Sequence, residues 1–263
     1  MPTLERRVAI DAACAAGRLL LAELLRPRRI AYKGTPTNLV TEMDGRAEEL
    51  IVDRLLAAFP DDGILAEERG AQAGRSGRRW IIDPLDGTTN YAHGLPVYAV
   101  AIGLVVERRV ELGVVYDPSR DELYVGERGH GATVNDRSLA VSATATLDRS
   151  LLATGFPSDI RETRDTNLRE YAAFAVRCRG VRRMGSATLD LAWLAAGRFD
   201  AFWELSLGPW DVAASSLFIE EAGGRVTGLT GGPLDLDAPA VVASNGRIHE
   251  AVLAVLAEVR AGG

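Results

Sequence analysis

The chain has 263 residues, of which 47% are hydrophobic and 25% charged, a composition typical of a globular protein with a sizeable buried core. Its 36 acidic and 30 basic residues give a net charge of −6, which argues against nucleic acid as a partner, because nucleic-acid-binding proteins usually carry a basic excess. No apolar run approaches the roughly 20 residues of a membrane span, and the charged N-terminus does not resemble a signal peptide, so we expect no membrane association and a cytoplasmic location.

The cysteines and the lysine content are the unusual features of the composition. Cys14 and Cys178 are too few for a disulfide framework and lack metal-ligand spacing. Of the 30 basic residues 29 are arginine, and the only lysine is Lys33. Codon bias explains why lysine is rare. The alternative is that position 33 requires a compact ammonium rather than a guanidinium.

The first half of the chain predicts a pair of helices followed by an antiparallel meander. A continuous apolar run at residues 97–106 is typical of a strand covered on both faces. The preceding strand is expected to stop at Pro84, because proline has no N–H to donate to a neighbouring strand. The predicted elements are a helix at 4–25, a basic loop at 26–38, a helix from Thr41 to Pro60, a strand at 63–66, a mobile loop at 70–77, and strands at 79–83, 97–106, 110–116 and 123–125.

The second half alternates strands and helices, as in a layered α/β unit. The predicted elements are strands at 151–154, 181–184, 199–203 and 240–243, helices at 163–177, 186–196 and 209–222, and a last helix capped by Asn245. The sequence contains no linker between the halves and no internal repeat. We therefore expect one unit over residues 1–263, with subdomains of approximately 1–145 and 146–263 that share a core.

Residues 80–90 carry the most informative chemistry. Asp83 and Asp86 lie three residues apart at the end of a predicted strand, where Pro84 and Gly87 turn the chain sharply. Clustered carboxylates are costly to hold together unless a hard divalent cation neutralises them, and the backbone amides of such a turn can bind phosphate. The segment indicates metal-assisted phosphoryl chemistry. On this segment alone, both aspartates could equally be ordinary turn residues.

Two further carboxylates stand at positions suited to a site. Glu67 follows the strand at 63–66, and Asp211 lies at the start of a helix, where negative charge is favoured. Each also has a purely structural interpretation, and Asp211 is a good N-cap.

Together these segments resemble the inositol monophosphatase family, within the wider group of magnesium-dependent, lithium-sensitive sugar phosphatases. The resemblance covers nearly the whole chain, in the family's order and approximate spacing. Its five motifs lie at residues 39–44, 63–68, 80–90 and 185–187, and at 210–213 with 221–224. It implies an α+β fold, the layered αβαβα sandwich shared with fructose-1,6-bisphosphatase, and a homodimer.

The resemblance also implies a site for two to three Mg²⁺ ions. Glu67, Asp83 and the backbone carbonyl of Leu85 are expected to bind the first ion. Asp83, Asp86 and Asp211 are expected to bind the second, and a weaker third is expected near Glu67. No covalent enzyme intermediate is then needed, because a metal lowers the pKa of bound water.

The catalytic residues follow from the same resemblance. Asp44 and Thr88 resemble the pair that polarises the attacking water, with Glu67 orienting that water, and the amides of Gly87 and Thr88 are expected to bind phosphate. Asp44 also completes the Thr41-x-x-Asp44 pattern of a capping box, so a structural role stays open for it.

Substrate contacts are expected from a second group of residues, namely Asp86, Gly185, Ser186, Ala187 and Glu204. Glu204 could also be an exposed strand-end acid. Arg183 is not among the predicted contacts, and a salt-bridge or an interface role is the alternative for it. Lys33 matches a lysine that family members carry near the mouth of the site, where an ammonium would pair with Glu67 or with a metal-bound water.

The expected function is Mg²⁺-dependent hydrolysis of a small polyol phosphomonoester, foremost myo-inositol 1-phosphate. Histidinol phosphate, fructose 1,6-bisphosphate and adenosine 3′,5′-bisphosphate are alternative substrates on the same fold. A different class of function is a regulatory binding protein, because some bacterial members that resemble this chain associate with transcription machinery. The intact carboxylate set favours catalysis.

Overall fold

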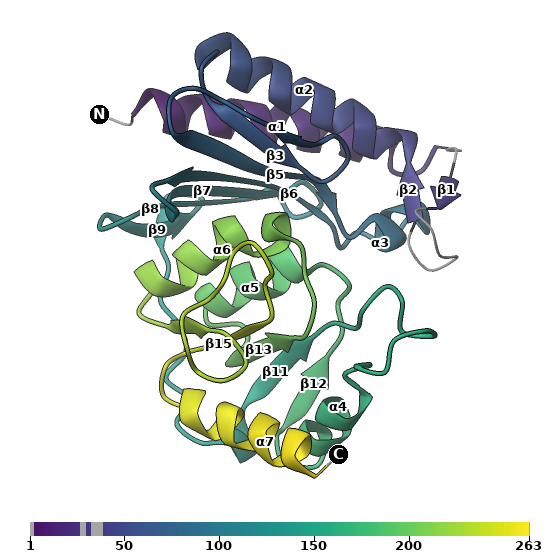
Figure 1. Ribbon diagram of the computed structural model, residues 1–263, viewed down its shortest axis with the longest axis vertical. Helices are drawn as coiled ribbons and strands as arrows, with labels where there is room; N and C mark the ends of the chain where they lie inside the picture. Colours follow the sequence, from purple (N-terminus) through teal and green to yellow (C-terminus); the bar gives the residue numbers. More distant parts are fainter. Residues whose placement is uncertain (1–2, 27–29, 33–38, 263) are drawn as a thin grey trace.

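Helices and sheets alternate in five layers in the computed structural model, which describes residues 3–26, 30–32 and 39–262 (Figure 1). From top to bottom in Figure 1 these are a helix pair, an eight-stranded sheet, a second helix pair, a five-stranded sheet and a final helix layer. The α+β class and the αβαβα layering expected from the sequence are both confirmed. The sheet changes between β10 and β11, between residues 138 and 151.

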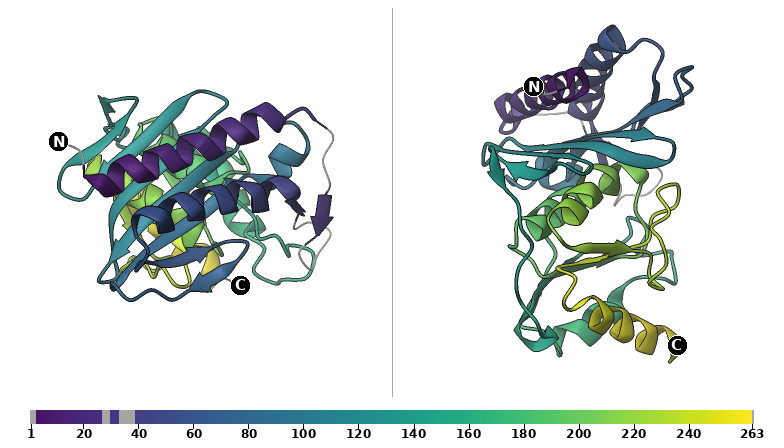
Figure 2. Two further views of the ribbon diagram at one scale, coloured as in Figure 1. Left: turned by 90° about the horizontal axis from the view of Figure 1, so that it is seen from above. Right: turned by 90° about the vertical axis from the view of Figure 1, so that its left-hand side faces the viewer.

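The first layer consists of α1 (Leu4–Glu23) and α2 (Glu42–Ala58), which lie across one face of the large sheet (Figure 2). The Thr3 side chain caps α1, and a capping box formed by Thr41 and Asp44 begins α2. Small buried residues of α1, such as Ala9, Ala12 and Ala16, allow the helix to pack closely on the sheet. The predicted start of the second helix is confirmed.

The large sheet is antiparallel except for one parallel pair, β3 with β5. In spatial order its strands are β10 (Arg137–Ser138), β9 (Gly131–Val134), β8 (Glu122–Glu127), β7 (Arg109–Asp117), β6 (Ala99–Val106), β5 (Arg78–Asp86), β3 (Gly63–Ala66) and β4 (Gly70–Gln72). A short helix, α3 (Thr88–Ala92), follows β5. The predicted meander is confirmed.

Three local predictions in the first half were wrong. Strand β5 does not stop at Pro84 but continues to Asp86, because a shift in register between Asp83 and Asp86 accommodates the missing N–H. The loop at 70–77 begins with the edge strand β4, and the loop at 26–38 contains β1 (Ile30–Tyr32), which pairs with β2 (Leu39–Thr41). Short edge strands of this kind have too little periodicity to be read from sequence.

The smaller sheet consists of β12 (Gly180–Arg182), β11 (Leu151–Thr154), β13 (Ala201–Glu204), β15 (Val241–Ser244) and β14 (Arg225–Thr227). A 3₁₀ turn, η1 (Leu147–Arg149), precedes it. Helices α5 (Ala187–Ala195) and α6 (Pro209–Glu221) fill the space between the two sheets, and α4 (Leu168–Ala175) and α7 (His249–Ala261) cover the outer face.

Two helix starts differ from the predictions. Helix α4 begins five residues later than expected, after Asn167 in the left-handed conformation. Asn245 caps a turn rather than the last helix, because its Oδ1 accepts from the N–H groups of Arg247 and Ile248, and α7 begins only at His249. The apolar face of α7, which includes Val252, Val255 and Leu256, packs against the small sheet.

A row of three glycines lets α6 lie directly against the large sheet. Gly103, Gly113 and Gly126 face one another across β6, β7 and β8. A methyl group at Gly113 would lie 2.7 Å from the carbonyl oxygen of Ala214, and one at Gly126 would lie 2.8 Å from the ring of Phe218. The close approach fixes the depth at which α6 sits.

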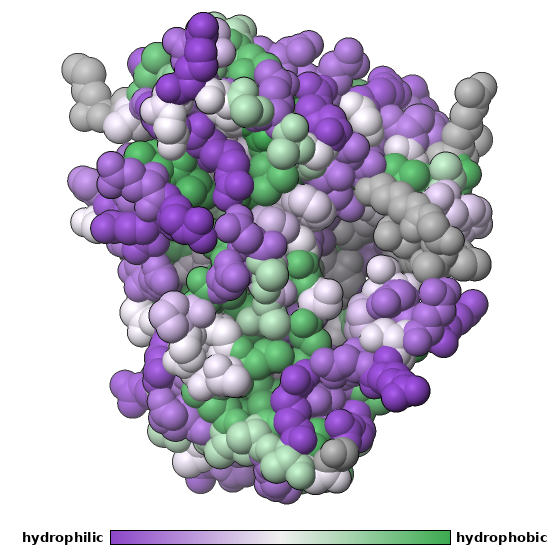
Figure 3. Space-filling view, in the orientation of Figure 1, coloured by the Kyte–Doolittle hydropathy of each residue, from purple (hydrophilic) through white to green (hydrophobic). Residues whose placement is uncertain are grey.

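None of the described helices is long and apolar enough to cross a membrane. Hydrophilic residues cover much of the face seen in Figure 3, and hydrophobic residues gather mainly in its lower centre. Cys14 and Cys178 are half-buried free thiols.

Opposite effects are expected for two glycine-to-alanine changes, one in the glycine row and one on the exposed side of α2. Gly113→Ala should lower the free energy of unfolding by about 1–3 kcal/mol, because the methyl group has no space under α6. Gly45→Ala, on the exposed side of α2 with nothing within 4 Å, should raise it by about 0.5–1 kcal/mol. Urea titration of both variants checks this, and two equal shifts would contradict it.

His249 makes the stability depend on pH. Burial lowers its pKa to about 4, and the neutral ring lies between the hydroxyls of Ser244 (2.9 Å from Nδ1) and Thr227 (3.0 Å from Nε2). Because the unfolded chain takes up the proton near pH 6.5 and the folded one does not, the free energy of unfolding should fall by up to about 3 kcal/mol between pH 6.5 and 4. His249→Gln should lack this component, and parallel pH profiles of the two proteins would refute the assignment.

Candidate metal centre and active site

Three aspartates converge at one point between the large sheet and the middle helix layer. Asp83 and Asp86 come from the end of β5, and Asp211 comes from the first turn of α6. One carboxylate oxygen of each lies within 4.8 Å of the others. Asp83 and Asp86 are buried and Asp211 is half-buried. Asp211 thus joins the two β5 residues through the fold and not through sequence proximity.

Local hydrogen bonds hold each carboxylate in place. Asp83 Oδ1 accepts from the Leu85 N–H at 3.0 Å, inside the irregular end of β5. Asp211 Oδ2 accepts from the Gly208 N–H at 2.6 Å, as the N3 residue at the start of α6. Each carboxylate keeps other lone pairs for a ligand.

Asp86 is held by the start of α5. Its Oδ2 accepts from the Ser186 hydroxyl at 2.6 Å and from the Thr188 N–H at 2.7 Å. Because α5 belongs to the second half of the chain, Asp86 connects the two halves at the site.

Electrostatic repulsion accompanies this convergence. Burial raises the pKa of Asp83 well above its usual range, and the negative charges of Glu67, Asp86 and Asp211 raise it further. Burial and the charges of Asp86 and Glu67 likewise raise the pKa of Asp211. Burial raises the pKa of Asp86 too, but the hydrogen bonds that its carboxylate accepts from Ser186 and Thr188 oppose this rise. Such a site favours a bound cation.

Glu67 lies at the edge of this cluster. It follows β3, and its N–H donates to the Ile82 carbonyl of β5 at 3.2 Å, which keeps the turn beside Asp83. Its half-buried side chain lines the same pocket as Asp86 and Asp211. Among the described residues it is not one of the three acids whose oxygens meet within 4.8 Å.

Asp44 and Thr88 meet beside the aspartates. The Thr88 hydroxyl lies 3.0 Å from Asp44 Oδ1 and 3.0 Å from the Leu85 carbonyl. Asp44 Oδ2 accepts from the N–H and the hydroxyl of Thr41 at 2.8 and 2.7 Å. The capping box and the contact with Thr88 therefore coexist, one on each carboxylate oxygen.

Gly87 permits the sharp turn from β5 into α3. It has a φ of 92°, and a Cβ there would lie 2.8 Å from the Val97 carbonyl. Only glycine adopts this conformation in this space without strain. The turn brings the backbone of Gly87 and the side chain of Thr88 to the wall of one pocket.

Asn90 is a positioning residue. Its Nδ2 donates to the Val97 and Met184 carbonyls, both at 2.8 Å, and lies 3.3 Å from the Gly185 carbonyl. It thereby ties the turn after β5 to the segment that begins α5. A lone asparagine gives no sequence signal for such a long-range contact.

The expected substrate contacts surround one pocket. Gly185, Ser186, Ala187 and Glu204 all line it, together with Glu67, Asp86 and Asp211. Glu204 is buried at the end of β13 and is not an exposed strand-end acid. Lys33 lies outside the described residues.

Arg183 also lines this pocket, and its guanidinium has no ion pair with the described residues. The salt-bridge alternative for Arg183 therefore finds no partner in the part of the chain that the structure covers.

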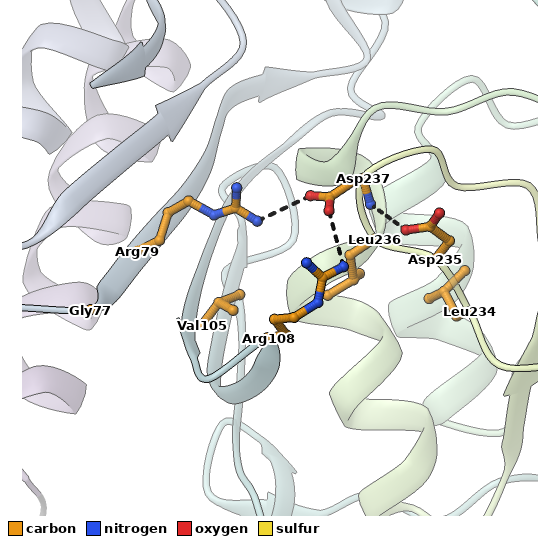
Figure 4. A pocket seen from close by; sticks show the side chains of 8 residues that line it. All are labelled: Gly77, Arg79, Val105, Arg108, Leu234, Asp235, Leu236 and Asp237. Carbon is orange, nitrogen blue, oxygen red and sulfur yellow. Dashed lines mark hydrogen bonds and ion pairs between the residues drawn. The ribbon is translucent and has the colours of Figure 1, made fainter. Parts of the chain in front are cut away.

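A second cavity, shown in Figure 4, shares no residue with the aspartate cluster. There Asp237 lies 3.4 Å from Arg79 and 3.3 Å from Arg108, and these exposed ion pairs tie a surface loop to β5 and to the β6–β7 turn. Exposed pairs of this kind contribute little stability.

Similarity to known proteins now identifies the family. A model of the inositol monophosphatase family matches residues 3–261. The chain belongs to this family. It is 44% identical over 252 residues to an inositol-1-monophosphatase of Synechocystis, covering 95% of this chain and 88% of that protein. It is 41% identical over 250 residues to the Nus factor SuhB of Escherichia coli, covering 94% and 93%.

A solved structure agrees with this assignment. The inositol monophosphatase of Anabaena superposes with a TM-score of 0.88 at 41% identity, over 96% of this chain and 95% of that one. The protein is therefore a phosphomonoesterase of a metal-dependent family, and its acidic cluster is suited to binding metal.

Removing one charge from the cluster should stabilise the metal-free protein. With a chelator present, Asp83→Asn should unfold about 2–4 °C above the wild type, because the repulsion with Asp86 and Asp211 is reduced. Added Mg²⁺ should raise the melting temperature of the wild type and not that of Asp83→Asn.

Asp53→Asn is the matched control, since Asp53 is an exposed aspartate of α2. It should leave both the metal-free melting temperature and the Mg²⁺ response unchanged. A Mg²⁺ response retained in Asp83→Asn would show that the ion binds elsewhere.

Proposed function

We propose that this chain hydrolyses a small polyol phosphomonoester, foremost myo-inositol 1-phosphate, with the help of Mg²⁺. The observation that carries the proposal is the convergence of Asp83, Asp86 and Asp211 within 4.8 Å, with Asp86 and Asp211 on the wall of one pocket and the Thr88 hydroxyl bonded to Asp44 and Leu85 beside them. The name of the Synechocystis relative supports the substrate.

The donor set fits a hard divalent cation. All candidate ligands are oxygens, namely the carboxylates of Glu67, Asp83, Asp86 and Asp211 and the carbonyl of Leu85, and Mg²⁺ prefers carboxylate and water oxygens. These residues would hold two to three ions. When bound, the ions would neutralise the phosphate and make hydroxide available near neutral pH.

The protein's own groups would orient the attack. Thr88 can donate its single hydroxyl proton to Asp44 or to Leu85, and its oxygen is then aligned to accept from a water molecule. Glu67, on the facing wall of the pocket, would orient the same water. The backbone amides of Gly87 and Thr88 would stabilise the charge on the phosphate oxygens.

The leaving group would face the second half of the chain. Gly185, Ser186 and Ala187 bring backbone groups to the pocket wall, and Glu204 adds a buried carboxylate that accepts hydrogen bonds from hydroxyl groups. Asp86, held by Ser186, would serve both the metal and the substrate.

Histidinol phosphate, fructose 1,6-bisphosphate and adenosine 3′,5′-bisphosphate are the alternative substrates of this proposal. The E. coli relative's name favours a second candidate function, in which the chain acts with transcription machinery. The complete set of pocket carboxylates supports catalysis as the primary role. The same proposal includes a cytoplasmic location, a homodimer, no affinity for nucleic acid and inhibition by lithium.

A phosphate-release assay over these four substrates tests the function. With Mg²⁺, the highest kcat/KM is expected for myo-inositol 1-phosphate, and no release is expected with a chelator. Release from none of the four, together with binding to transcription proteins, would favour the regulatory role instead.

The role of Thr88 can be measured in the same assay. Thr88→Val should lower kcat by roughly 10²-fold or more, because the water loses its orienting hydroxyl. Thr88→Ser keeps the hydroxyl and should retain most of the activity. Equal losses in the two variants would indicate that the side chain matters only for packing.

A further inference from the structure

Asp190 is a buried acid that none of the roles above uses. It lies on α5 with a relative exposure of 1%, and its side chain lines the same pocket as Glu204 and Asp211. Its Oδ1 has no hydrogen-bond partner among the described residues. A buried carboxylate oxygen without a partner is costly, and native structures rarely retain one without a reason.

Glu204 is a second buried acid that lines the same pocket. It is buried at the end of β13, and neither of its oxygens accepts a hydrogen bond from the described residues. A Cβ on Gly155 would come within 2.4 Å of the Glu204 carboxylate, so the glycine leaves space for that carboxylate in the pocket wall. Two acids without hydrogen bonds thus share one end of the pocket.

The charged groups around Asp190 and Glu204 shift the pKa of both carboxyls. Burial raises the pKa of Asp190 well above its usual range, the negative charges of Glu204 and Asp86 raise it further, and the Arg183 guanidinium opposes this. Burial also raises the pKa of Glu204, which Arg183 again opposes. One exposed arginine faces two buried acids, so this end of the pocket has an excess of hydrogen-bond acceptors and of negative charge.

We propose that Asp190 is a specificity-determining residue that, with Glu204, selects substrates whose leaving group supplies several hydrogen-bond donors and rejects those that carry a second phosphate. The inference rests on the proposed function and deepens it. Hydroxyl or ammonium groups of the leaving group would satisfy the carboxylates, whereas a second phosphate would add negative charge beside them. Asp190 lines the pocket together with Glu204 and does not line the cavity of Gly87 and Thr88, so we expect it to act mainly on substrate binding.

Asp190→Asn tests this by steady-state kinetics with myo-inositol 1-phosphate and fructose 1,6-bisphosphate at saturating Mg²⁺. For the monophosphate, KM should rise about tenfold while kcat changes less than about threefold. The ratio of kcat/KM between the monophosphate and the bisphosphate should fall by about tenfold or more. Asp190→Ser, which removes the charge without adding volume, should move the ratio in the same direction.

Asp62→Asn is the matched control, because Asp62 is also a buried aspartate but lies away from the pocket and is bonded to Arg78 and Trp80. It should lower the melting temperature and leave the substrate ratio unchanged. Asp190→Asn should not lower the melting temperature, since it removes an acid without a partner.

The outcomes separate this inference from the proposed function. An unchanged substrate ratio in both active Asp190 variants, or a loss of kcat that is equal for both substrates, would overturn the role of Asp190 alone. Absence of phosphate release by the wild type from either substrate would overturn the proposed function and, with it, this inference.

Discussion

Repulsion among buried like charges is the constraint on which the rest of this structure depends. Asp83, Asp86 and Asp211 meet within 4.8 Å, and burial removes the water that would otherwise screen them. The chain opposes the repulsion with N–H and hydroxyl donors from three separate segments, at Leu85, at Ser186 with Thr188, and at Gly208. The compensation is partial, which leaves the site with a strong preference for a cation.

The glycine row under α6 determines where the third carboxylate can be. Asp211 lies in the first turn of α6, and the depth of that helix depends on Gly103, Gly113 and Gly126 having no side chains. Larger residues there would lift the helix and move Asp211 away from the end of β5. The packing of α6 on the large sheet therefore also sets the geometry of the site.

The sequence predicted the parts of the molecule that depend on local pattern or on motifs. The long helices, the meander and the segment from Asp83 to Thr88 fall in this class, because periodicity and turn chemistry act over a few residues. The continuation of β5 through Pro84 was missed because it depends on the neighbouring strand β6. The edge strands β1 and β4 were missed because three residues carry too little pattern.

The same distinction applies to the site. Asp211 was assigned to the site only through the family resemblance, since its local sequence also fits an N-cap. In the structure it is instead the N3 residue of α6, and its carboxylate accepts from the N–H of the N-cap residue Gly208. Asn90 is the last residue of the motif at 80–90 and Asp190 lies outside the motifs, and neither position carries a local signal of its role. Asn90 matters because its amide donates to the backbone carbonyls of two other segments. Asp190 matters because its buried Oδ1 has no hydrogen-bond partner among the described residues. Both are properties of the folded chain.

The two oxygens of Asp44 have a consequence for the dynamics of the protein. One oxygen accepts from Thr41 in the capping box that begins α2, and the other accepts from the Thr88 hydroxyl. Fraying of the first turn of α2 would therefore break the contact between Asp44 and Thr88 in the same event, while the bond from Thr88 to the Leu85 carbonyl could remain. Opening of a helix end requires less free energy than global unfolding, so the contact between Asp44 and Thr88 can break while the core stays folded.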